Sequence, residues 1–200
     1  MTEQFPYPSR QIFYNGKPQQ SSGPIFQTID PSTALPLANV HSADHNDVNL
    51  AILSASRAFL SWSKMPYNER SRILLKAVSL LRERNNQLAE VETHDTGKPF
   101  SETSTVDITT GTDVLEYYAY LVGGGGLNGE TTRLRTDAWV YTTKEPLGVC
   151  AGIGAWNYPI QMYVVNEIAS NFFRIWRYIP YADNLCQKCS LEVCTLSCCR

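Results

Sequence analysis

Three long stretches of the chain carry apolar residues at steps of three and four, the spacing of an amphipathic helix. They cover residues 42–64, 67–95 and 101–122. Asp44 or Asn46 can cap the first helix, and Gly97 followed by a proline is a typical end for the second. The predicted apolar faces are Val48, Ile52, Ala55, Phe59 and Trp62; then Ile73, Leu74, Ala77, Val78, Leu81, Leu88 and Val91; and then Val106, Ile108, Val114, Leu115, Tyr118 and Leu121.

Short β-prone runs lie on both sides of these helices. Asn15-Gly16 predicts a hairpin turn, and residues 24–29 and 37–41 predict two further strands. Residues 133–144 alternate in polarity, which predicts one strand with a single buried face. Residues 149–154 are apolar or tiny, which favours a buried parallel strand opening into a loop. The pattern therefore predicts an α/β fold.

Four consecutive glycines, residues 123–126, separate the third helix from the strand that follows. Such a run is either a phosphate cradle or a connector. No Gly-Lys-Ser/Thr follows it and no clear strand precedes it, so we expect a flexible connector.

Composition excludes several functions. The 200 residues carry 17 Lys+Arg against 19 Asp+Glu, a net charge of -2, and are 43% apolar. At roughly 150 residues per domain this is one domain, or one and a piece. The charge gives no basic footprint, so nucleic acid is not the expected partner. No apolar run reaches about 18 residues, so no membrane span is expected. The first residues show no secretory signal, and we expect a cytoplasmic protein.

The cysteines are concentrated at one end of the chain. Five of the six lie in the last 15 residues, namely Cys186, Cys189, Cys194, Cys198 and Cys199. A zinc site is a poor fit because one pair is adjacent and no histidine is near. A redox Cys-x-x-Cys would need a preceding strand. The favoured interpretation is a spliced, read-through or frame-shifted end without selected structure. Cys150, inside the predicted strand, is expected to be a core residue.

Residues 145–159 are the stretch most suggestive of chemistry. The predicted strand ends in Gly152-Ile153-Gly154-Ala155, where tiny side chains allow close approach of a ligand, and Trp156 and Asn157 follow. Ligands of open parallel sheets bind beyond the carboxyl ends of the strands, where an amide can donate a hydrogen bond to a developing oxyanion. A packed turn with a buried tryptophan and a capping asparagine is the alternative.

The chain resembles the NAD(P)-dependent aldehyde dehydrogenases from about Pro24 to Gln161, and within them the betaine-aldehyde branch. The resemblance is carried by many collinear segments: Arg70-Ser71-Arg72-Ile73-Leu74, Leu81-Arg82-Glu83-Arg84-Asn85, Glu92-Thr93-His94-Asp95-Thr96-Gly97-Lys98-Pro99, Ser101 to Ile108, Asp113 to Ala119, and Gly152-Ile153-Gly154-Ala155-Trp156-Asn157-Tyr158-Pro159.

This resemblance implies an incomplete α/β fold, the N-terminal part of the aldehyde dehydrogenase fold. It divides into an N-terminal segment (1–23), the first part of a cofactor domain (24–130), an oligomerisation strand (131–146), the first Rossmann-like strand with the oxyanion loop (147–161), and an unrelated tail (162–200).

The resemblance also implies site residues. Asn157 matches the oxyanion donor, and Gly154, Ala155 and Trp156 match the lining of the NAD or NADP cleft. Thr28, Ile29 and Asp95 match a potassium site, whose oxygen donors suit a hard cation; otherwise Asp95 simply bonds nearby backbone. The strand at 133–144 matches the arm that pairs subunits in a homo-oligomer.

The resemblance implies oxidation of a small-molecule aldehyde to its acid. However, the 200 residues contain neither the Gly-Gln-x-Cys setting of the family's nucleophile nor the Glu-Leu-Gly-Gly setting of its general base. They are expected to hold only the first parallel strand of the sheet. We therefore expect an oxidoreductase chain that is inactive alone, or a non-catalytic isoform that docks on full-length subunits.

Overall fold

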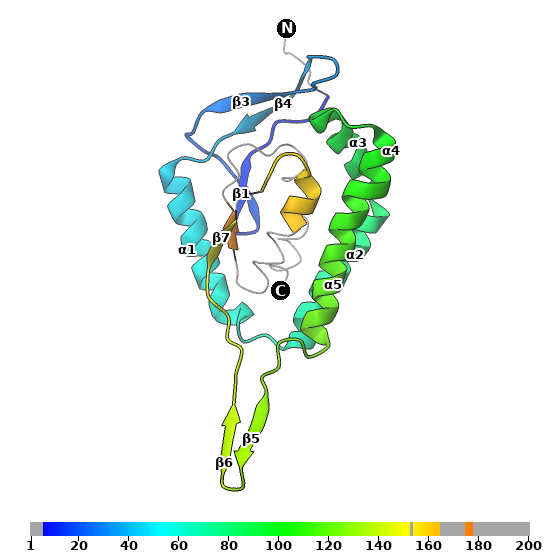
Figure 1. Ribbon diagram of the computed structural model, residues 1–200. Coiled ribbons are helices and arrows are strands. Elements are labelled where there is room, and N and C mark those ends of the chain that lie inside the picture. Colours follow the sequence, from blue (N-terminus) through cyan, green and yellow to red (C-terminus); the bar gives the residue numbers. More distant parts are fainter. Residues whose placement is uncertain (1–5, 153, 165–174, 178–200) are drawn as a thin grey trace.

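The computed structural model describes residues 6–152, 154–164 and 175–177, and it shows helices arranged around short paired strands (Figure 1). Strands β1 (Ile12–Tyr14) and β2 (Lys17–Gln19) form an antiparallel hairpin. Its turn is the predicted Asn15-Gly16, with φ of 56° and 75°, values that asparagine and glycine adopt most readily. Strands β3 (Ile25–Ile29) and β4 (Pro36–His41) form a second antiparallel pair, which confirms the two strands predicted there.

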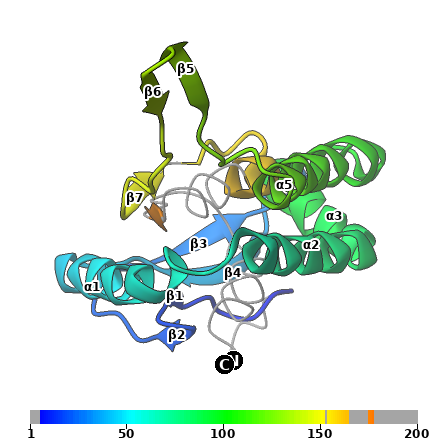
Figure 2. The ribbon, with the colours of Figure 1, turned by 90° about the horizontal axis from the view of Figure 1, so that it is seen from below.

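Helix α1 (His45–Trp62) is capped by Asp44, one of the two residues predicted for this role. Asp44 and Asp47 accept each other's backbone N–H at 2.8 and 3.0 Å, a reciprocal cap. The predicted apolar face is only partly correct, because Trp62 is buried whereas Ile52 is 39% exposed. Helix α1 lies on the opposite side of the molecule from the main helical layer, so that layer does not cover its face (Figures 1 and 2).

The predicted single helix over 67–95 is wrong, because two helices occupy it. They are α2 (Tyr67–Glu83) and α3 (Asn85–Thr96), separated at Arg84, whose ψ of 13° lies outside the helical range. The break redirects α3, so that Leu88 and Val91 reach the same core as Leu81. Gly97 then ends α3 in the left-handed conformation (φ 75°), as its position predicted.

The predicted helix over 101–122 is present but not uniform. It consists of α4 (Phe100–Glu102), the π-helical segment η1 (Thr103–Asp107) and α5 (Ile108–Gly123). A π turn contains an extra residue, which rotates the side chains that precede it. Val106, predicted to point inward, lies within this π-helical segment and is 44% exposed, whereas Ile108 and Leu115 are buried as expected.

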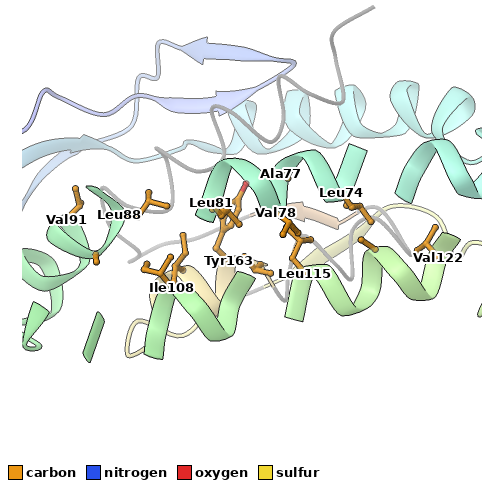
Figure 3. Close-up of a cluster of buried hydrophobic side chains, with 14 residues drawn as sticks. Leu74, Ala77, Val78, Leu81, Leu88, Val91, Ile108, Leu115, Val122 and Tyr163 are labelled. Carbon is orange, nitrogen blue, oxygen red and sulfur yellow. The ribbon is translucent and has the colours of Figure 1, made fainter. Parts of the chain in front are cut away.

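The main core lies between α2, α3, α5 and a helix at residues 159–164 (Figure 3). Ile160, Tyr163 and Val164 of this last helix are at most 1% exposed. The helix packs closely on α5, because a Cβ added at Gly111 would lie 3.2 Å from Gln161 Cα. The helix at 159–164 is therefore packed against the layer formed by α2, α3 and α5.

The glycine run 123–126 is a packed turn. Gly123 lies against α2, because a Cβ there would lie 2.7 Å from Ser71 Oγ, and Ser71 Oγ donates to Ala119 O. Gly125 has a φ of 88°. The connector therefore has a defined path, and it leads into the next hairpin.

The predicted single strand over 133–144 is wrong, because the chain reverses within it. Strands β5 (Thr131–Arg135) and β6 (Ala138–Tyr141) form an antiparallel hairpin that projects from the molecule (Figure 1). Asp137 in the turn pairs with Arg135 at 3.0 Å. Both faces of the hairpin are solvated, and the side predicted as buried is exposed, with Leu134 at 65% and Val140 at 45%.

Strand β7 (Cys150–Gly152) pairs in parallel with β8 (Ile175–Arg177), so the predicted parallel character is confirmed. The expectation that the chain holds only the first parallel strand is wrong, because β8 is a second one. The strand is only partly buried: Gly152 is buried, Ala151 is exposed, and Cys150 is half-buried. None of the helices in the described part of the chain has the length and apolarity of a membrane-spanning segment.

We predict that Leu81→Ala lowers the free energy of unfolding by about 2–5 kcal/mol, because Leu81 is 4% exposed and its removal leaves a cavity. Leu134→Ala is the matched control: Leu134 is 65% exposed, so the change should stay within about 0.5 kcal/mol. Urea unfolding followed by circular dichroism measures both. Equal losses of unfolding free energy in the two variants would contradict the assignment of Leu81 to the core.

Candidate functional site

The loop after β7 presents Asn157 to solvent. Residues 156 and 157 form a turn between the strand and the helix at 159–164, and Asn157 is exposed. Trp156 is 72% exposed, so the alternative of a turn closed by a buried tryptophan is wrong. Of the residues predicted to line a cofactor cleft, Gly154 is half-buried and Ala155 is exposed. The loop is therefore accessible from outside.

The helix at 159–164 begins immediately after this loop. Its first internal bond runs from Met162 N to Tyr158 O at 2.9 Å, which places Tyr158 at the N-cap and Pro159 at the first helical position. Proline is favoured there because its fixed φ suits the helix and its missing N–H is not needed. Asn157 precedes the cap residue, so it is not the capping asparagine of the alternative interpretation and its amide stays available.

Two carboxyl groups and one lysine lie beneath the loop. Glu92 of α3 and Asp107 of η1 are both 0% exposed. Lys98 Nζ donates to Asp107 Oδ2 at 2.6 Å and lies 3.5 Å from the centre of the Tyr158 ring. Glu92 lies beside Asp107 and the backbone N–H of Ile160. We call Glu92, Lys98 and Asp107 the buried acid cluster.

Burial controls the charge of this cluster. The pKa of Glu92 is raised from 4.5 to about 8, first because burial removes water from the charged form and then because Asp107 lies next to it. The Ile160 N–H and Lys98 act in the opposite direction but are outweighed. At neutral pH the cluster therefore holds a protonated Glu92 beside an Asp107 that is paired with Lys98.

The residues predicted to bind potassium lie where β3 meets the end of α3. His94 Nδ1 is 3.2 Å from Asp30 Oδ2, and a Cβ at Gly97 would lie 2.8 Å from Pro31 Cγ, so the two segments are in contact. Thr28 is buried and Asp95 is half-buried, whereas Ile29 is 55% exposed.

A potassium ion at this position would need oxygen ligands beyond those of Thr28, Ile29 and Asp95. The Asp30 carboxylate is already engaged by Ser32, Thr33 and His94, and these partners hold its pKa far below the usual range. The described residues contain no group of three or more His, Cys, Asp or Glu that could hold a metal ion. Three oxygens supply only part of the six or more ligands that a hard cation takes. The potassium site stays a prediction, and no chemistry is assigned to it.

A sequence model of the aldehyde dehydrogenase family matches residues 18–171. The chain belongs to the aldehyde dehydrogenase family. The match encloses the segment from Pro24 to Gln161 that carries the resemblance and continues past its expected end.

Solved aldehyde dehydrogenases have the same fold. Indole-3-acetaldehyde dehydrogenase AldA of P. syringae, solved in complex with NAD+ and IAA, is 28% identical with a TM-score of 0.80, covering 93% of this chain and 38% of its own. The Bacillus cereus aldehyde dehydrogenase is also 28% identical, with a TM-score of 0.80 and coverage of 94% and 38%. Gamma-glutamyl-gamma-aminobutyraldehyde dehydrogenase of Burkholderia cenocepacia J2315 is 27% identical, with a TM-score of 0.82 and the same coverage. The chain thus spans about two fifths of the length of these structures, and the predicted partial α/β fold is confirmed.

Sequence reasoning missed the buried acid cluster in this aldehyde dehydrogenase chain. Glu92 follows Leu88 by four residues and Val91 by one, so it falls on the apolar stripe of its own helix. A carboxylate on such a stripe is almost never fully buried without a partner. The position of an acidic residue on an apolar stripe was therefore a sequence signal for a buried carboxyl group with a partner. The π turn that brings Asp107 opposite Glu92 has no comparable sequence mark. The predictions for Cys186, Cys189, Cys194, Cys198 and Cys199 lie outside the described residues.

We predict that the chain loses stability as the pH rises from about 5.5 to about 8. The folded state keeps the Glu92 proton up to about pH 8, whereas the unfolded chain releases it near 4.5. The folded state therefore binds more protons in this window, and the free energy of unfolding falls by up to about 1.4 kcal/mol per pH unit. Urea unfolding at several pH values measures the slope.

Glu92→Gln should flatten this slope, because the amide cannot ionise. Glu90→Gln, an exposed position on the same helix, is the matched control and should retain it. A wild-type stability that is constant or rises between pH 5.5 and 8 would contradict the assignment.

Proposed function

We propose that this chain serves the NAD(P)-dependent oxidation of an aldehyde to its carboxylic acid, with Asn157 as the oxyanion donor. The observation that carries the proposal is the position of Asn157: it is exposed, in the loop that follows a parallel strand, and next to the cap residue of a helix whose first turn is buried. Membership of the aldehyde dehydrogenase family supports the reaction class.

The chemistry assigned to these residues is limited and specific. When a thiolate attacks the aldehyde carbonyl, the carbonyl oxygen gains negative charge, and the Asn157 amide donates a hydrogen bond to it. NAD(P), when bound, accepts the hydride. Gly154 and Ala155 allow the nucleotide to approach the backbone because their side chains occupy almost no space. Water and a general base then release the acid.

The nucleophile and the base are proposed to come from outside these 200 residues. None of the six cysteines stands in a Gly-Gln-x-Cys setting, and Cys150 is half-buried in β7 with its Sγ directed at Gly148 O, 3.9 Å away. We therefore propose that residues 1–200 alone do not catalyse the oxidation of an aldehyde. Betaine aldehyde is the substrate that the resemblance suggests, and it is the first to test.

In a full-length enzyme that carries these residues, Asn157→Ala should lower kcat about 10²–10³-fold, the usual loss of an oxyanion donor. The value of KM should change little, because the bond forms mainly in the transition state. NADH formation with betaine aldehyde measures the rate. Asn86→Ala, an exposed asparagine on α3, is the control, and the 200-residue chain alone is the blank. A variant that retains kcat within two-fold, or turnover by the blank, would contradict the proposal.

A second proposed role is docking of this chain on full-length subunits through the β5–β6 hairpin. The supporting observation is the apolar surface of the hairpin: Trp139 is 61% exposed and Tyr141 is 77% exposed, on strands that contact little else (Figure 2). An exposed strand pair with aromatic side chains favours pairing with another chain. The same hairpin is the proposed homo-oligomer contact of the complete enzyme.

We predict that the purified chain co-elutes with full-length aldehyde dehydrogenase subunits on size exclusion, and that Trp139→Ala with Tyr141→Ala weakens this association at least tenfold. Aromatic anchors supply much of the energy of an interface. Tyr117→Ala on α5, where the side chain is 62% exposed, is the matched control and should leave binding unchanged. Failure of the unmodified chain to co-elute would remove the docking role.

A further inference from the structure

The buried acid cluster occupies the space directly under the Asn157 loop, and the oxyanion chemistry proposed above makes no use of it. Glu92 and Asp107 come from different elements, α3 and η1, and both are fully buried. Complete burial of two acidic groups is costly, so each needs compensation nearby. The burial of both acids at this position therefore indicates a specific structural role for the cluster.

One arm of the cluster reaches the residue next to Asn157. Lys98 donates to Asp107 at 2.6 Å, and its ammonium lies 3.5 Å from the centre of the Tyr158 ring. A cation at this distance from an aromatic face is attracted by the ring quadrupole, more strongly where water is scarce. The Lys98 side chain is 19% exposed, so the contact is largely shielded. Asp107 thus fixes Lys98, and Lys98 holds the Tyr158 ring.

The other arm reaches the first turn of the helix that follows Asn157. Ile160 is the second helical residue, so its N–H has no partner within the helix. The Glu92 carboxyl group lies beside it, and Ile160 itself is 0% exposed. Neither Glu92 oxygen forms a hydrogen bond that meets normal geometry in the described part of the chain, so this arm is a close approach of the carboxyl group to the N–H. Tyr158, which caps the helix, and the first turn that follows it thus both lie against the same cluster.

The buried acid cluster can balance only one negative charge, because it contains a single lysine. The charged groups that face Glu92 are Asp107 of η1 and Lys98 of the segment between α3 and α4, and the Ile160 amide of the helix at 159–164 lies beside it. With one lysine and two acids, a single carboxylate is balanced. A second one would stand beside Asp107 without a counter-ion, in a site closed to water.

We propose that Glu92, Lys98 and Asp107 are positioning residues for Asn157, which hold its loop through the contact of Lys98 with Tyr158 and the packing of Glu92 beside the first turn of the following helix. Ionisation of Glu92 sets two carboxylates against each other, draws Lys98 between them and weakens its contact with Tyr158. The loop then shifts, and Asn157 moves with it. The catalytic meaning of this shift rests on the proposed function, whereas the shift itself does not.

Trp156 is a built-in reporter of the loop, because it lies two residues from Tyr158 and is 72% exposed. The protein contains four tryptophans, so labelling with 5-fluorotryptophan gives few ¹⁹F resonances, and Trp156→Phe assigns the relevant one. We expect this resonance to shift with pH with a midpoint of about 8, where Glu92 releases its proton. The resonances of the other tryptophans should not show that midpoint.

Variants separate positioning from simple stability. Glu92→Gln imitates the protonated acid and should keep the low-pH resonance at every pH, whereas Lys98→Met should displace it even at low pH. Glu90→Gln should titrate like wild type. Circular dichroism confirms that each variant is folded, and the wild-type titration needs no variant at all.

Two results would overturn the proposal: a Trp156 resonance that does not respond to pH between 6 and 9 in wild type, or one that responds identically in Glu92→Gln. The measurement needs no nucleotide and no aldehyde. If Asn157→Ala retains full activity while Trp156 titrates as expected, the proposed function fails and the positioning role of the cluster stands.

Discussion

The structure depends on the packing of a short helix, residues 159–164, against the layer formed by α2, α3 and α5. Ile160, Tyr163 and Val164 are buried almost completely, and Gly111 allows the two backbones to approach closely. This contact connects the end of the parallel strand pair to the helical layer. Because the helix starts at Pro159, it also determines where the preceding loop leaves the core. The exposed position of Asn157 is thus a consequence of what is buried three residues later.

The same contact explains why polar groups are found in the core. The first turn of a helix leaves N–H groups without partners, and here that turn is buried against α3 and η1. The Glu92 carboxyl group lies beside the buried Ile160 N–H, and its neighbour Asp107 is compensated by Lys98. Hydrocarbon side chains could fill the space but could not bind the lysine. A polar cluster is therefore tolerated where a loop of defined position emerges.

The sequence predicted local features well and their spatial relations less well. The Asn15-Gly16 turn, the Asp44 cap and the Gly97 helix end follow from the backbone preferences of single residues, so each could be predicted. The break at Arg84 could not, because it depends on how α3 must turn to bring Leu88 into the core. The π turn before Ile108 and the reversal within 133–144 were missed for the same reason: tertiary packing or a short turn interrupted a continuous pattern. The exposure of Asn157 needed the structure, since the spacing fitted a buried turn equally well.

Large apolar side chains are exposed on several elements, among them β3, α1, α5 and the β5–β6 hairpin. On the projecting hairpin they are Leu134, Trp139 and Tyr141, and on α1 they include Leu53 and Leu60. An isolated globular chain seldom leaves such patches without a function, whereas the face between α2 and α5 is closed tightly. The chain therefore combines a closed core, which carries the Asn157 loop, with exposed apolar side chains, and the docking proposed above would use those of the hairpin. The proposed role of Asn157 is compatible with this arrangement, because the core supports its loop on one side and leaves it open on the other.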